Sequence, residues 1–149
     1  MSNHPEHAAV ETLLGELKSR WDSNDLKRLR ELWHPDDDAP LYQPEEVEAP
    51  LTSWDAVFDY WDKTAESIIS FEMRTWDLHI KDLGPELLNV WYRMYWRGEI
   101  HGYDKPIAGE NRVTATLQRT PDGWRYRQLT EAPIAPILYM RWLYEKAAE

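Results

Sequence analysis

The repeat of apolar residues changes once along this chain of 149 residues, near residue 67. Before that point apolar side chains recur at three- and four-residue steps, which is the spacing of amphipathic helices. After it they alternate in steps of two, which is the spacing of strands. Helices grouped first and strands grouped after, joined by connections of hairpin length, are typical of an α+β fold with an antiparallel sheet.

Three helices are expected in the first part of the chain, at residues 8–21, 26–33 and 54–66. The second follows Asp25, a residue suited to an N-cap, and ends at Pro35. Ser53 stands in the N-cap position of the third helix. Residues 36–53 are rich in proline and acidic side chains, which predicts a loop with at most short extended pieces.

Four strands and a closing helix are expected after residue 67. The strands fall at residues 68–81, 87–100, 112–120 and 124–130, and Pro-Asp-Gly at 121–123 predicts a hairpin between the last two. We expect residues 1–7 to lack fixed structure, 8–133 to form one domain and 134–149 to form a C-terminal helical extension. This extension is too apolar to lie in solvent, which predicts a homodimer or homotrimer.

The charge and the cysteine count exclude several classes of function. With 17 basic and 27 acidic residues the formal net charge is −10, which disfavours nucleic acid and anionic membrane surfaces as partners. There is no cysteine, no secretory signal pattern and no apolar run of membrane-spanning length, so we expect a cytoplasmic protein. The chain has no glycine-rich phosphate loop and its histidines are scattered, so neither a nucleotide cofactor nor a metal is expected.

The order of the elements resembles the nuclear transport factor 2-like superfamily, in particular its SnoaL-like and ketosteroid-isomerase-like members. The resemblance rests on Arg-Trp-Asp-Ser-Asn-Asp-Leu at 20–26, Pro-Leu-Thr-Ser-Trp-Asp-Ala-Val at 50–57 and Thr-Pro-Asp-Gly-Trp-Arg at 120–125. It implies a cone-shaped curved antiparallel sheet wrapped around three N-terminal helices, plus a C-terminal helix, with a pocket at the mouth. Members include isomerases, dehydratases, cyclases, small lyases and proteins without activity. The resemblance places the catalytic residues of the isomerases on Leu17, on or beside Gln43 and near Ala115, which argues against that activity.

The strand expected at 87–100 carries the richest set of candidate catalytic residues. One face is polar and aromatic, and Arg93 and Arg97 on it could stabilise an oxyanion, with Tyr95 as donor and His101 as general acid or base. The alternative is an exposed or interfacial face with cross-strand pairs from Arg to Glu72 or Glu131.

Further candidates lie elsewhere along the chain. His79 follows Asp77 at a spacing that would let the carboxylate orient the imidazole, although a solvated histidine at a strand end fits equally well. Tyr42 is a further candidate for proton transfer, placed where the mouth of the cone is expected. The expected substrate-binding residues are Tyr60, Trp61, Trp91, Tyr103 and Glu131, of which Tyr60 and Trp61 also fit a helix that packs on the core.

These features together favour a cofactor-independent acid–base enzyme. The chain has 9 Trp and 8 Tyr but only 2 Phe, and polar-tipped rings suit a pocket for a small hydrophobic, aromatic molecule. The reaction would begin with proton abstraction and continue as elimination, isomerisation, cyclisation or retro-aldol cleavage. The alternative is a non-catalytic ligand-binding or structural oligomer of the same fold.

Overall fold

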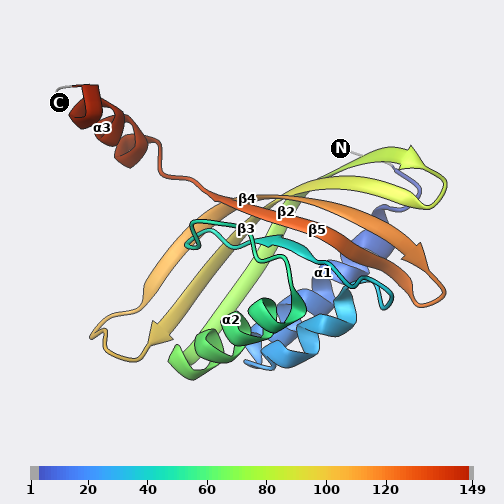
Figure 1. Cartoon of the computed structure of the whole chain (residues 1–149), viewed down its shortest axis with the longest axis horizontal. Helices are drawn as coiled ribbons and strands as arrows, with labels where there is room; N and C mark the ends of the chain where they lie inside the picture. The colour runs from blue at the N-terminus through green and yellow to red at the C-terminus, as the bar shows by residue number, and fades with distance from the viewer. Residues whose placement is uncertain (1–3, 148–149) are drawn as a thin grey trace.

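A curved sheet of five strands forms the body of this computed structural model, which describes residues 4–147 (Figure 1). The order across the sheet is β1-β5-β4-β3-β2. The long strands β2 to β5 pair with one another in antiparallel fashion, as the sequence predicts. The bounds are β1 Leu41–Gln43, β2 Ile68–Gly84, β3 Leu87–Ile100, β4 Ile107–Thr120 and β5 Gly123–Pro133.

The sheet is mixed rather than wholly antiparallel, because β1 pairs with β5 in parallel. The chain reaches this position by running along β5: Trp33 bridges Tyr126, and Leu41 pairs with Gln128 a few residues later. A strand of three residues inside a proline-rich loop has too little periodicity to reveal its direction. The strand β1 nevertheless matters for the cavity described below, because it directs the side chain of Tyr42 into the core.

The N-terminal helices cover the concave face of the sheet (Figure 1). They are α1 (His7–Asp22), the 3₁₀-helix η1 (Leu26–Leu32) and α2 (Trp54–Ser67). The predicted Ser53 cap is confirmed, since its Oγ accepts a hydrogen bond from the Ala56 amide at 3.2 Å. The second helix is 3₁₀ rather than α, and Asp25 makes no side-chain cap bond. Three residues per turn align Leu26, Leu29 and Leu32, and all three are buried.

The core lies between these helices and the inner face of the long strands. On β3 the inner face carries Leu88, Val90, Tyr92 and Met94, all buried. The opposite face, which includes Arg93 and the odd-numbered residues around it, lies on the convex side. The strand's alternation therefore separates the two faces as the sequence predicts.

The described residues before α1 are held against the body. The Glu6 carboxylate accepts hydrogen bonds from Trp124 Nε1 at 2.8 Å and from Arg119 at 2.7 Å. His4 Nε2 lies 2.9 Å from the Asp82 carboxylate. His4 and Glu6 thus have partners in the body of the protein, while residues 1–3 of the segment 1–7 lie outside the described part of the chain.

The helix α3 (Pro136–Ala147) follows β5 and stands away from the body (Figure 1). Several of its large apolar side chains are exposed, among them Leu138 at 69% and Trp142 at 52%. The last two residues of the expected extension, 148–149, lie outside the described residues. Within the described residues, no helix combines the length and the apolar character needed to cross a membrane.

Candidate functional site

Two adjoining hollows lie on the concave side of the sheet. The outer one, about 410 Å³, opens between the loop after β1 and the adjoining ends of β2 and β3. The inner one, about 20 Å³, lies among the core residues. Trp21, Met94 and Glu131 line both, so they mark the junction between the two hollows. We call the pair the cone cavity; the remaining residues of its outer part are Glu45, Glu46, Tyr60, Thr64, Ser67, Ile68, Phe71, Met73, Trp96, Ile100, Tyr103 and Ile107.

A β-bulge brings Glu131 to this junction. The register of β4 and β5 shifts between Thr116, which pairs with Gln128, and Leu117, which pairs with Tyr126. The extra residue, Arg127, changes which side chains of β5 face inward. Tyr126 is buried before the bulge and Leu129 after it, and Glu131 follows Leu129 on the same face.

The carboxyl group of Glu131 is held by two donors. Tyr42 Oη donates to Oε1 and the backbone amide of Glu45 donates to Oε2, each at 3.2 Å. The residue keeps some exposed surface because it faces the cavity, although protein surrounds the carboxyl group. This burial raises the pKa of Glu131 to about 8; the Glu45 amide and Tyr42 oppose the rise, and Glu45 and Glu46 add to it by repulsion. Glu131 is therefore mostly protonated at neutral pH.

Tyrosines and acids surround the carboxyl. Burial, followed by repulsion from nearby Glu131, raises the pKa of both Tyr42 and Tyr60, so their hydroxyls stay protonated and can donate. Tyr60 Oη donates to Glu46 at 2.5 Å, and the rings of Tyr42 and Tyr60 meet edge to face at 5.9 Å. Burial also raises the pKa of Glu45. These groups give the junction both hydrogen-bond donors and proton acceptors.

Asn111 is a second polar residue on the inner face of the sheet near the site. It is fully buried on β4, opposite Met94. Its amide lies near Glu45 and opposes the rise in the pKa of that carboxyl. Within the described part of the chain, neither Nδ2 nor Oδ1 of Asn111 reaches a hydrogen-bond partner. A buried amide in this state is available to a ligand or to a water molecule.

Aromatic rings form one wall of the outer hollow. Trp21 lies 5.1 Å from Phe71, and Phe71 stacks on Trp96 at 6.0 Å with an interplanar angle of 9°. Behind Trp96, on the next strand, Gly109 leaves room for the indole: a Cβ at this position would lie 2.9 Å from the ring. The shape of the wall therefore depends on the absence of a side chain at Gly109.

Replacing Gly109 with alanine is expected to move Trp96 and to lower stability by about 1–3 kcal/mol, because the new methyl overpacks the ring. Urea unfolding monitored by circular dichroism checks the stability. Gly15→Ala is the matched control, since its Cβ meets nothing within 4 Å and a helix favours alanine by about 0.5–1 kcal/mol. Equal stabilisation in both variants would contradict the role given to Gly109.

Five of the expected site residues do line the cone cavity. Tyr60 and Tyr103 line the outer part, Tyr42 and Trp61 the inner part, and Glu131 both. Trp61 is 1% exposed and contacts Tyr42, Trp54 and Phe58, so it also belongs to the core. Tyr103 stands at the mouth, 64% exposed.

The structure does not bring the β3 candidates to this cavity. Trp91, Arg93, Tyr95 and Arg97 lie on the convex face, where Arg93 pairs with Glu110 and Arg74 stacks on Tyr95 at 4.6 Å. The pair of Arg93 and Glu110 is the kind of cross-strand pair expected for an exposed face, although the expected acids were Glu72 and Glu131. His101 follows β3 in an exposed turn, and its backbone amide bonds to Ser67.

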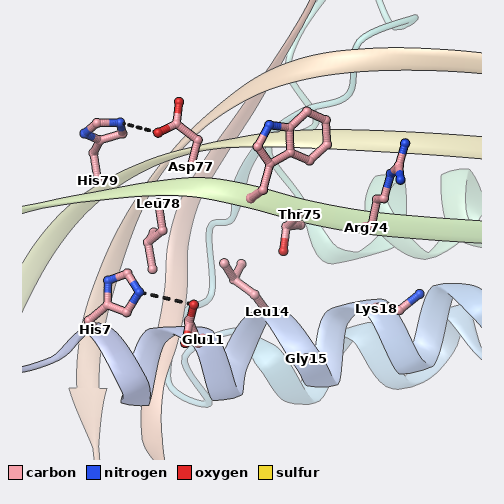
Figure 2. A pocket seen from close by; sticks show the side chains of 11 residues that line it. His7, Glu11, Leu14, Gly15, Lys18, Arg74, Thr75, Asp77, Leu78 and His79 are labelled. Atoms are coloured by element: carbon pink, nitrogen blue, oxygen red, sulfur yellow. Dashed lines mark hydrogen bonds and ion pairs between the residues drawn. The ribbon is translucent and has the colours of Figure 1, made fainter. Parts of the chain in front are cut away.

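His79 lies in a separate open groove between α1 and β2 (Figure 2). The expected contact with Asp77 is present: His79 Nε2 lies 2.9 Å from Oδ1. Both side chains project from β2 away from Leu78, which points toward α1, and both are largely exposed (Figure 2). Asp22, the acid at the end of α1, instead accepts from the Met73 amide at 2.8 Å and contacts Lys18.

Sequence reasoning missed several residues of the cavity. Trp96 follows the apolar alternation of β3, which is typical of a core residue, and the structure shows that this face also lines the cavity. Glu45 and Glu46 lie in the segment 36–53, for which the sequence predicts a loop and no part in the cavity. The described residues contain no cluster of three or more histidine, aspartate or glutamate side chains able to hold a metal ion.

The cone-shaped sheet with helices on its concave face and a cavity between them is the nuclear transport factor 2-like fold. Solved structures with this fold include a protein assigned as a scytalone dehydratase from Novosphingobium aromaticivorans, with 12% identity, a TM-score of 0.78, and coverage of 87% of this chain and 85% of that one. A protein assigned as a dehydratase from Streptomyces avermitilis has 16% identity, a TM-score of 0.73, and coverage of 86% and 95%. Hexachlorocyclohexane dehydrochlorinase LinA-type3 from Novosphingobium barchaimii has 16% identity, a TM-score of 0.68, and coverage of 89% and 92%.

A family model identifies the branch within that fold. The model of the SnoaL-like domain matches residues 10–135, which is most of the chain. The chain therefore belongs to the SnoaL-like family. No curated protein matches the sequence significantly.

Proposed function

We propose that this protein is a cofactor-independent acid–base enzyme of the lyase or isomerase type, acting on a small, largely hydrophobic molecule in the cone cavity. The observation that carries the proposal is Glu131, a buried carboxyl at the junction of an apolar cavity, whose pKa of about 8 lies near neutral pH. A general acid or base works best when its pKa is close to the working pH. Strongly shifted carboxyls in clefts are typical of catalytic sites.

The arrangement suits abstraction of a proton from carbon. The ionised Glu131 would take the proton, and the electron pair left behind would move onto an adjacent carbonyl oxygen of the substrate. Tyr60 supplies the hydroxyl that could hold that oxygen, since burial keeps it protonated. The protonated Glu131 could then return the proton at another carbon or to a leaving group, which gives isomerisation or elimination.

The names of similar structures support the same class of reaction. Among them are proteins named as dehydratases and a dehydrochlorinase, and both names describe eliminations. Their identity to this chain is 16% or less, so the support concerns the kind of reaction rather than the substrate.

Glu131→Gln is expected to abolish proton abstraction. Wild type and variant would be incubated in D₂O with a panel of aromatic ketones that carry acidic C–H groups, and deuterium incorporation followed by proton NMR. We expect incorporation with wild type and a loss of at least about 100-fold in the variant, because the proton acceptor is gone. Glu72→Gln, an exposed carboxylate on β2, is the control. Exchange at the wild-type rate in the Glu131 variant would refute the assignment.

A non-catalytic oligomer remains the second candidate function, and α3 is the observation that favours it. The exposed apolar residues on this helix predict a homodimer or homotrimer in which the helix packs on a neighbouring copy. The double variant Leu138→Glu and Trp142→Glu is expected to reduce the mass measured by light scattering to that of the 17.7 kDa chain. Leu83→Glu, in the exposed hairpin end of β2, controls for a general effect of added charge. A wild-type protein that is already a monomer would contradict the prediction.

A further inference from the structure

The charged side chains of the cone cavity all carry the same sign. Glu45, Glu46 and Glu131 line it, and among the described lining residues of its two hollows there is no lysine, arginine or histidine. The interactions that shift the pKa of Glu131 agree with this composition: the charged groups that act on it are the acids Glu45 and Glu46. A cavity with this lining has a negative potential, which burial of the Glu45 and Glu131 carboxyls strengthens.

Aromatic rings form the part of the cavity wall that carries no acid. Trp21, Phe71 and Trp96 form a continuous row of rings, and Tyr60 and Tyr103 complete the outer hollow. The faces of aromatic rings attract organic cations, most strongly where water is excluded. Trp96 also lies near the Glu45 carboxyl, so ring and carboxylate are placed to contact one charged group together.

We propose that the ligand of this cavity is an organic cation, a small ammonium compound with an apolar, ring-containing body. The ammonium group would lie between the Glu45 and Glu46 carboxylates and the Trp96 face, and the apolar body against Trp21, Phe71 and Met94. This proposal takes the cone cavity as the ligand site, as the proposed function does, and adds the charge of the ligand. An anionic substrate would meet carboxylates with no cation to balance them.

Glu131 makes this binding depend on pH. The groups that face it are Glu45 and Glu46 from the loop after β1, Tyr42 from β1 and Tyr60 from α2, with Tyr92 and Tyr126 close by on β3 and β5. The tyrosines stay neutral because burial raises the pKa of each. Between pH 6.5 and pH 9 Glu131 gains its negative charge, so a cation of fixed charge should bind more tightly as the pH rises.

The test compares, by isothermal titration calorimetry, three probes that share a naphthalene ring and differ in charge. These are a trimethyl(naphthylmethyl)ammonium ion, whose charge does not titrate, the neutral naphthylmethanol and the anionic naphthoate. For the full-length wild type at pH 8 we expect the cation to bind at least 10-fold more tightly than the alcohol, with no measurable binding of the carboxylate. We also expect the affinity for the cation to rise at least 3-fold from pH 6.5 to pH 9.

Variants assign the effect to the cavity. Glu45→Gln with Glu46→Gln should reduce the preference for the cation over the alcohol to less than 3-fold, while Glu48→Gln, an exposed acid of the same loop, should leave it unchanged. Equal binding of cation and alcohol by wild type, tighter binding of the carboxylate, or a preference that survives in the double variant would overturn the proposal. Deuterium exchange with neutral ketones would still test the acid–base function separately, so either proposal can fail while the other stands.

Discussion

Replacing Glu131 with glutamine is expected to make the protein more stable than wild type at pH 9, by on the order of 5 kcal/mol, and to change its stability little at pH 4. The pKa of Glu131 is about 8 in the folded protein, against an ordinary value of 4.5. Between these two values the folded state holds a proton that the unfolded state has released. The stability that protonated Glu131 contributes to the wild type is therefore fully present below pH 4.5 and is lost as the pH rises through 8.

Urea unfolding at pH 4, 6, 7.5 and 9 measures this difference. Glutamine keeps the shape of the protonated carboxyl and does not ionise, so the variant should lack the part of the pH dependence that Glu131 contributes. Glu72→Gln should retain the wild-type slope, because that carboxylate is exposed on β2. A parallel decline in wild type and Glu131→Gln would mean that the folded protein does not hold the proton.

Trp61→Ala is expected to destabilise the protein by about 3–5 kcal/mol, the usual cost of removing a fully buried large aromatic side chain. The side chain is 1% exposed and its ring lies 5.8 Å from Phe58 and 6.4 Å from both Tyr42 and Trp54. Its removal would open the inner hollow and release Tyr42, which holds Glu131. Thermal unfolding at constant pH measures the loss.

Trp61→Phe separates ring packing from the polar edge of the indole. Within the described residues Nε1 of Trp61 is buried and has no hydrogen-bond partner, so removing it gives up no bond. We expect this variant to lose less than half as much stability as Trp61→Ala. Equal losses would show that the part of the indole that phenylalanine lacks, rather than an aromatic ring as such, holds this part of the core.

The sequence predicts the framework of this fold well because that framework rests on periodic burial. The stripe of Val10, Leu13, Leu14 and Leu17 on α1 is buried as expected, and Ser53 caps α2. The bounds of β3 are those that the alternation predicts. The pairing partner of β1 was not predictable, because parallel pairing with β5 depends on contacts between residues almost ninety positions apart.

The site was harder to predict from the sequence than the framework. Alternation on β3 separates two faces, but it does not say that the apolar face lines the cavity and that Arg93 and Tyr95 lie outside. The presence of a tryptophan does not tell which face lines the cavity, because Trp96 faces the cavity and Trp91 faces the convex surface. Glu131 was expected only as a lining residue, and its raised pKa arises from burial, with repulsion from Glu45 and Glu46 added, in surroundings that the fold brings together.

The bulge at Arg127 makes the site depend on the number of residues in a strand as well as on their identity. Tyr126 and Leu129 both face inward although they are three positions apart, so without the bulge an unbroken two-residue alternation from Tyr126 would turn Leu129 and Glu131 outward, while the chemical identity of every side chain stayed the same. Insertions and deletions are usually tolerated in loops and damaging in strands because of hydrogen bonding. In β5 the loss of one residue after the bulge, such as Thr130, would also turn Glu131 from the cavity to the outer face, so strand length is itself inherited as part of the site.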